Sequence, residues 1–262
     1  MSWAHLVVAF VMAVVGGAGG WLAPRVLARL PEPPPDDEDA PPSAGEVVDE
    51  SVAGVEPVAD DPAPPVPAKV PYAELAARPG LGVRLGVVAA VASGTIGLVL
   101  GPDPSLPAWA YLSVLGVLLS YVDWTTRLLP FRLVAPSYPV MALLLAGAAL
   151  VSGEWSALLR AGLAWVAVFA VFLLMWLVYR RGIGYGDVRL SGILGMSLGW
   201  LGWHEVVVGL YAAFLVGAVV GGLLSVAKVV DRKGYAFGPF LLLGTWIGVV
   251  ATPAIGGAVG WS

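Results

Sequence analysis

Two aspartates, Asp123 and Asp187, have the residue type and the placement that acid–base chemistry needs. Each lies where a long apolar segment meets a more polar one. Two carboxyl groups that share one site cannot both ionise readily, so one of them stays protonated. The carboxylate can then take a proton from water, while the acid donates a hydrogen bond to a substrate carbonyl. Such a pair can hydrolyse a peptide bond without a nucleophilic side chain or a metal.

Each aspartate also has a purely structural interpretation. Asp123 stands four residues before Arg127, which is the spacing of an ion pair along a helix. Asp187 follows the Gly-rich run 182–186, where a carboxylate could cap the N-terminus of the next helix. These glycines let the backbone leave the helical conformation, which is tolerated at membrane depth only beside protein or water. Because both acids are expected on one side of the membrane, a shared site is favoured.

The composition indicates whether the chain lies in water or in a lipid bilayer. Of the 262 residues, 58% are hydrophobic and 12% are charged, and the mean hydropathy is +0.85. Soluble domains carry about 25% charged residues, so an ordinary globular protein is excluded and a bilayer is expected. The chain has no cysteine, which excludes disulfides, thiolate metal sites and a cysteine nucleophile. Two histidines are too few for a histidine metal site, and the net charge of −4 gives no reason to expect nucleic acid.

Apolar runs of about 17–25 residues predict membrane-spanning helices. The predicted fold is all-α, a polytopic membrane protein with about eight transmembrane helices. The sixth run is the weakest of the eight because it is short and rich in glycine. The runs cover residues 4–24, 83–101, 107–122, 133–152, 157–179, 188–203, 205–229 and 236–260.

The basic residues predict the orientation of these helices. No Lys or Arg precedes the first run, whereas Arg25 and Arg29 follow it, which is typical of an uncleaved anchor with its N-terminus outside. With that orientation, thirteen of the fourteen basic residues fall on the cytoplasmic side, and only Arg160 does not. Asp123 and Asp187 lie at the cytoplasmic boundary as well. We therefore expect a multi-pass protein of the inner (plasma) membrane.

The stretch between the first two runs has the opposite composition. Twelve of the eighteen acidic residues and twelve of the twenty-two prolines lie between Pro31 and Glu74. Such a sequence buries too little apolar surface to offset the loss of chain entropy, so residues 31–68 are predicted to form a disordered acidic linker. A docking tail is the functional alternative to a solvated spacer.

Three motifs at the ends of the predicted helices resemble those of type IV prepilin leader peptidases, which are intramembrane aspartyl proteases. The segment Gly184-Tyr185-Gly186-Asp187 is similar to the Gly-x-Gly-Asp signature of that family. Asp123 followed by Pro130 resembles the segment of the first catalytic aspartate, and Phe237-Gly238-Pro239-Phe240 resembles the opening of the last span. The resemblance covers about residues 120–262 well and 17–80 loosely.

The resemblance implies an activity, site residues and partners. Asp123 and Asp187 would be the catalytic pair of an aspartyl endopeptidase. The reaction would remove the short basic leader of prepilins or pseudopilins at the cytoplasmic face, just before their hydrophobic segment. Residues 1–30 would be the first transmembrane helix, 31–82 the acidic linker, and 83–262 a seven-helix peptidase core. The implied partners are these substrates and membrane lipid, and the supporting residues are Pro130, Gly184, Gly186, Arg189, Gly238 and Pro239.

Two features depart from the family pattern. Many members carry a cytoplasmic domain with two cysteine pairs that bind zinc and that is associated with N-methylation of the new N-terminus. Here the linker 31–82 occupies that position, so leader removal without N-methylation is expected, with no zinc site and no cofactor; S-adenosylmethionine is doubtful. Arg189 stands where the family often has Lys. It could pair with a carboxylate or grip a substrate carbonyl, or it could simply anchor the helix at the membrane surface.

Paired acids in a membrane also serve proton-coupled transport, which is the alternative function. Such a transporter predicts an inverted repeat with broken helices in both halves. The sequence contains one Gly-broken segment, at 182–187, and no clear twin of it. A third interpretation is a catalytically silent subunit of a pilus or secretion apparatus.

Overall fold

The computed structural model describes residues 2–32, 70–180, 183–226 and 236–259. Most of the predicted acidic linker, Gly182 and the basic residues near Asp231 fall outside the described residues. Every element in the described part is a helix, which confirms the all-α prediction. The helices are α1 (Trp3–Leu27), α2 (Tyr72–Ala76), α3 (Leu81–Leu100), α4 (Leu106–Thr126), α5 (Phe131–Ser152), α6 (Trp155–Val178), α7 (Tyr185–Leu201), α8 (Trp203–Val226) and α9 (Gly238–Val259).

Eight long helices lie where the eight apolar runs predicted them. Within the described residues, seven of these helices are long and apolar enough to cross a membrane. The eighth, α7, has 17 residues and corresponds to the weak sixth run. The chain is thus a multi-pass membrane protein.

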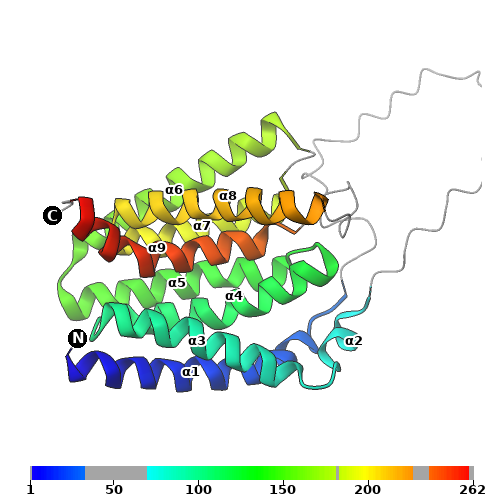
Figure 1. Ribbon diagram of the computed structural model, residues 1–262, viewed down its shortest axis with the longest axis horizontal. Coiled ribbons are helices and arrows are strands. Elements are labelled where there is room, and N and C mark those ends of the chain that lie inside the picture. Colours follow the sequence, from blue (N-terminus) through cyan, green and yellow to red (C-terminus); the bar gives the residue numbers. More distant parts are fainter. Residues whose placement is uncertain (1, 33–69, 181–182, 227–235, 260–262) are drawn as a thin grey trace, which may run out of the picture.

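The long helices lie side by side and run along the longest axis of the molecule (Figure 1). The start of α1, the end of α9 and the connections α3–α4, α5–α6 and α7–α8 lie at one end of the bundle. The α4–α5 turn, the start of α7 and the start of α9 lie at the other end, together with α2. The two predicted aspartates therefore fall at the same end of the bundle, as the alternation of the spans predicted.

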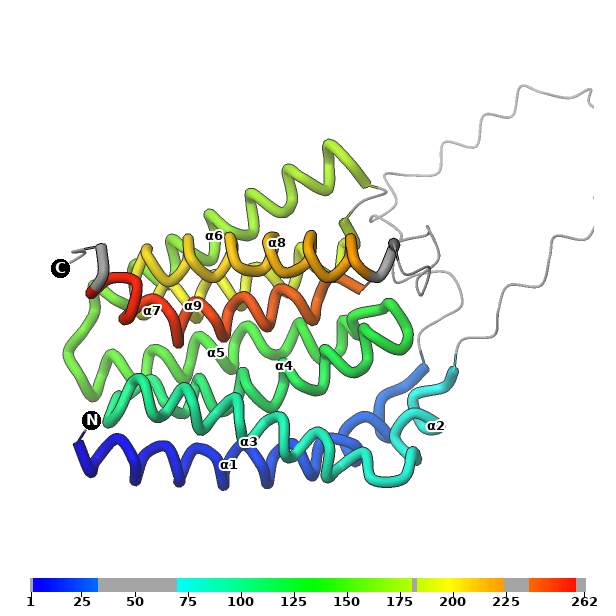
Figure 2. The backbone as a smooth tube through the Cα atoms, viewed as in Figure 1, coloured from blue at the N-terminus to red at the C-terminus, as the bar shows by residue number. Residues whose placement is uncertain are grey.

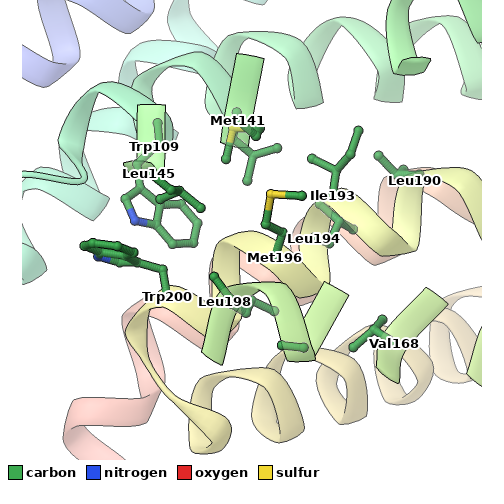
Figure 3. Close-up of a cluster of buried hydrophobic side chains, with 14 of the residues drawn as sticks. Trp109, Met141, Leu145, Val168, Leu190, Ile193, Leu194, Met196, Leu198 and Trp200 are labelled. Atoms are coloured by element: carbon green, nitrogen blue, oxygen red, sulfur yellow. The ribbon is translucent and has the colours of Figure 1, made fainter. Parts of the chain in front are cut away.

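Helix α7 is the centre of the bundle. It packs on α5, α6, α8 and α9, and all its residues from Asp187 to Trp200 except Arg189 are buried. Figure 3 shows side chains of α7 meeting Trp109 of α4, Met141 and Leu145 of α5, and Val168 of α6. Because other helices surround it, α7 does not need the length or apolarity of a lipid-facing span.

Small residues let α6 approach α7 closely. A Cβ at Gly195 would lie 2.8 Å from the backbone oxygen of Ala164, so a larger side chain could not be placed there. At the C-terminus of α7, Arg160 of α6 donates from Nε to the oxygen of Gly199 (2.8 Å) and from Nη2 to that of Trp200 (2.6 Å). These bonds satisfy carbonyl groups that a helix end leaves without partners.

The short helix α2 was not predicted, because it lies at the end of the segment assigned to the linker. Its N-terminus is capped from a distance, since the backbone N–H of Tyr72 donates to Oε1 of Glu32 over 2.6 Å. Tyr72 and Leu75 are buried in a small apolar cluster that also contains Leu118 and Val122 of α4. Figure 2 shows α2 beside the ends of α1 and α3. Helix α2 therefore packs against the part of α4 that carries Asp123.

Candidate active site

Asp123 lies inside the last turns of α4. The sequence placed the end of this span at residue 122, but the helix continues to Thr126 and buries Asp123, which is only 4% exposed. The helix ends at Arg127, the one non-glycine residue with a positive φ (58°) in the described chain. The N–H of Arg127 donates to the backbone oxygen of Asp123 over 2.7 Å. This left-handed residue turns the chain sharply toward Pro130, the N-cap of α5.

Asp187 lies in the first turn of α7 and is 6% exposed. The prediction that it caps this helix is wrong, because Gly184 occupies the N-cap position. The helix begins earlier than residue 188, since Tyr185 and Gly186 already have helical geometry. The N–H of Asp187 donates to the oxygen of Gly184 over 3.1 Å. A carboxylate in the first turn still benefits from the positive end of the helix dipole.

The two aspartates line one small cavity. Its volume is about 30 Å³, and its other walls come from the α4–α5 turn and the start of α7. A single water molecule needs on the order of 10–15 Å³ measured in this way, so the cavity has room for one or two. The lining residues are Asp123, Arg127, Leu128, Leu129, Gly184, Gly186 and Asp187.

The motif Phe237-Gly238-Pro239-Phe240 also contributes to this site. The backbone N–H of Gly238, the first residue of α9, donates to Oδ2 of Asp123 over 3.0 Å. A Cβ at position 238 would lie only 2.6 Å from the same oxygen. Pro239 occupies the first turn of α9, where a helix loses nothing by the absence of an N–H. The motif thus opens α9, as expected from the resemblance, and the first residue of the helix directs a backbone donor at a carboxylate.

Gly186 lets the start of α7 lie close to the α4–α5 turn. A Cβ at this position would lie 2.9 Å from Cβ of Leu129, in the turn that follows α4. By contrast, a Cβ at Gly184 would make an ordinary contact of 3.4 Å with Oδ2 of Asp187. The close approach explains why glycine stands directly before Asp187.

Arg189 is held between two aromatic rings. Its guanidinium lies 4.4 Å from the ring centroid of Tyr185 and 4.6 Å from that of Phe131. Its backbone oxygen accepts a hydrogen bond from the hydroxyl of Tyr138 at 2.5 Å. Arg189 therefore links the start of α7 to the start of α5, and its predicted contacts with a carboxylate or a substrate remain predictions.

The sequence motifs did not predict that Tyr185, Arg127, Leu129 and Phe131 border the site. The i, i+4 spacing of Tyr185 and Arg189 was a signal for a cation–ring contact. Arg127 was considered only as an ion-pair partner. No sequence pattern pointed to Leu129 or Phe131, which become neighbours of the site through tertiary packing. In the part of the chain that the structure describes, no three His, Asp or Glu side chains gather in a way that could hold a metal ion.

Comparison with known proteins finds similarity in the region that contains both aspartates. Residues 109–226 match the type IV leader peptidase family. Three curated relatives carry the name prepilin leader peptidase/N-methyltransferase. The relative from Aeromonas hydrophila is 29% identical over 195 residues, which is 71% of this chain and 59% of the relative. The relative from Aeromonas salmonicida (strain A449) is 30% identical over 63% of this chain and 56% of the relative.

A relative from Escherichia coli (strain K12) is 32% identical over 136 residues, or 49% of this chain and 56% of the relative. The chain thus spans a little over half the length of these curated relatives. No solved structure gives a significant match.

Proposed function

We propose that the chain is a member of the type IV leader peptidase family, whose model matches residues 109–226, and that it is a membrane-embedded aspartyl endopeptidase. Its substrates are type IV prepilins or pseudopilins, from which it removes the leader peptide. One observation carries the proposal: two buried aspartates from different helices line a single cavity with room for water.

The reaction follows from the chemistry of such a pair. One aspartate, as a carboxylate, takes a proton from the water while the water oxygen bonds to the scissile carbonyl carbon. The other, as an acid, donates a hydrogen bond to the carbonyl oxygen and stabilises the charge that develops there. The C–N bond then breaks, and the leaving nitrogen takes up the proton that the first aspartate removed from the water. One carboxyl group and one amine are formed, and the pair again holds a single proton. The N–H of Gly238 holds Asp123 in place during these steps.

Three further statements belong to the proposal. The site lies at the cytoplasmic face of the inner membrane. In the topology predicted from the sequence, most basic residues fall on the same side of the membrane as the two aspartates, and basic residues mark the cytoplasmic side. No metal or other cofactor takes part in the hydrolysis. The methyltransferase half of the relatives' name is not carried over to this chain, because the sequence has no cysteine for the zinc-binding segment associated with it.

The test compares wild-type protein with Asp123→Asn and Asp187→Asn in detergent, using a full-length type IV prepilin as substrate. Loss of one member of an acid–base pair should reduce the cleavage rate by about 10²–10⁴-fold. Glu154→Gln is the matched control, because Glu154 is exposed and belongs to the α5–α6 connection, which lies at the opposite end of the bundle from the α4–α5 turn. The mass of the new N-terminus reports both leader removal and methylation, and the unmethylated mass is expected.

Two results would contradict the proposal. Cleavage at the wild-type rate by either Asn variant would remove the aspartates from the mechanism. A wild-type protein that leaves the prepilin intact but moves protons across a vesicle membrane would instead support transport.

A further inference from the structure

A second, much larger hollow lies on the flank of the bundle. It is a groove of about 430 Å³ between α3, α4 and α9, and its lining is almost entirely apolar. On one rim, Val88 and Val91 of α3 are exposed to more than half of their surface, and on the other rim Leu243 of α9 is exposed too. Since these helices are long and apolar enough to cross a membrane, the groove opens toward the bilayer.

The floor of this groove is made of small residues of α4. Ser113, Gly116 and Ser120 lie at spacings of three and four residues, so they share one face of the helix. Helices in a membrane associate by close packing, and small residues let the backbones come near each other. At Gly116 the side chain of Leu242 occupies this face, with Cδ2 2.8 Å from a Cβ built there, so a helix in the groove would pack on Leu242 as well as on Ser113 and Ser120.

One end of the groove lies close to the catalytic aspartate of α4. Ser120 precedes Asp123 by one turn of α4, and Pro239 directly follows Gly238, whose N–H binds Asp123. From Ser120 the groove follows α4 back to Trp109, which is about 16 Å along a helix axis. A segment whose first residue lies at the aspartates therefore has the end of the groove within about one helical turn of it.

We propose that this groove binds the first turns of the apolar helix that follows the scissile bond of the substrate. The inference rests on the proposed function, in which the cleaved bond lies just before a hydrophobic segment. With the scissile carbonyl at the two aspartates, that segment must begin beside them and continue into the bilayer. The groove provides an apolar path of about three turns in that direction. A lipid acyl chain is the competing occupant, but only the substrate segment is tied to the groove by the position of the scissile bond at Asp123.

The first experiment fills the groove from its rim. Val91→Trp places a bulky side chain into the opening, which should raise the KM for a full-length type IV prepilin about tenfold, with little change in kcat. Val166→Trp on α6 is the matched control, because Val166 and Val91 have the same residue type and are 59% and 58% exposed. Helix α6 lies on the opposite side of the bundle from α3 (Figure 1). The control should keep the KM of the wild type.

The second experiment uses the absence of cysteine in this chain. Val91→Cys and Val166→Cys are each made in the Asp187→Asn background, so that bound prepilin is retained uncleaved. The prepilin carries one cysteine in the first turns of its apolar segment, and disulfide formation is driven by an added oxidant that takes up the two electrons. The cross-linked fraction should be about tenfold higher at position 91 than at position 166. Because cysteine is small, Val91→Cys still tests the proposal if Val91→Trp fails to fold.

The outcomes distinguish a failure of the groove proposal from a failure of the proposed function. Equal cross-linking at the two positions, or a wild-type KM for well-folded Val91→Trp, would show that lipid and not substrate occupies the groove. That result would overturn the inference while wild-type cleavage still stood. Failure of the wild-type protein to cleave would instead reject the proposed function. Selective cross-linking at position 91 would then still show that the groove binds an apolar helix.

Discussion

The backbone N–H of Gly238 donates a hydrogen bond to Oδ2 of Asp123 over 3.0 Å, although the two residues lie at the ends of different helices. The bond is buried and joins α9 to α4 at the wall of the small cavity. A carboxylate that accepts a fixed backbone donor keeps one orientation, so its other oxygen can be directed at water or substrate. Helix α9 therefore contributes to the site without contributing a charged side chain.

Gly238→Ala should disturb the hydrogen bond between Gly238 and Asp123 and leave the rest of the fold largely unchanged. The new Cβ would lie 2.6 Å from Oδ2 of Asp123, so the carboxylate or the start of α9 must shift. A displacement of about 1 Å in a catalytic group can reduce the rate about 100-fold. We expect such a loss in kcat for prepilin cleavage, with the helical content unchanged by circular dichroism.

Gly147→Ala provides the control for this substitution. Nothing lies within 4 Å of a Cβ built at Gly147 in α5, so the new methyl group meets open space. Alanine in the interior of a helix is more stable than glycine by about 0.5–1 kcal/mol. The control should retain wild-type cleavage. If Gly238→Ala cleaves as fast as this control, the bond to Asp123 has no role in the reaction.

The two glycines before Asp187 should differ in their tolerance of a methyl group. Gly186→Ala brings a Cβ to 2.9 Å from Cβ of Leu129 and must push the start of α7 away from the α4–α5 turn. Gly184→Ala makes only an ordinary contact, at a backbone conformation of φ −70° and ψ 143° that any residue adopts. The first should reduce cleavage about 100-fold, and the second by less than about threefold. Equal losses would mean that the motif needs backbone freedom and not close packing.

Much of this architecture could be predicted from local sequence signals. Apolar runs marked every long helix, and the alternation of spans put Asp123 and Asp187 at one end. The ends of the helices were less accurate, because an aspartate is polar and was taken to end or to cap a span. In the structure both aspartates lie inside helices and are buried by neighbouring helices.

Contacts between distant segments could not be predicted in this way. Helix α2 is stabilised by Glu32, which lies across the acidic stretch, and by packing on α4. The rings around Arg189 come from two helices, and only Tyr185 shares a local spacing with it. The groove is made by three helices whose faces each look like ordinary lipid-facing surface. Such features depend on how helices pack, which a hydropathy pattern does not specify.

Arg189→Lys tests whether the arginine acts through its shape or only through its charge. Lysine keeps the positive charge but loses the planar group that fits between Tyr185 and Phe131. Loss of such a contact costs roughly 1 kcal/mol, so the cleavage rate should fall about fivefold to tenfold. Phe131→Leu should have a similar effect, and the double variant should lose less than the product of the two. Full activity of Arg189→Lys would favour a role as a simple cation.

Arg160→Leu should destabilise the fold without altering the chemistry. Its guanidinium donates to the carbonyls of Gly199 and Trp200 at the end of α7 that is remote from the aspartates. Hydrogen bonds from a charged donor contribute about 1.5–3 kcal/mol, and the carbonyls left behind would have no replacement donor in an apolar setting. We expect a lower thermal midpoint in detergent, with the wild-type KM and kcat at low temperature. Arg84→Leu is the control, because Arg84 is exposed, and an equal loss there would mean that the general removal of a cation, and not the capping of α7, lowers stability.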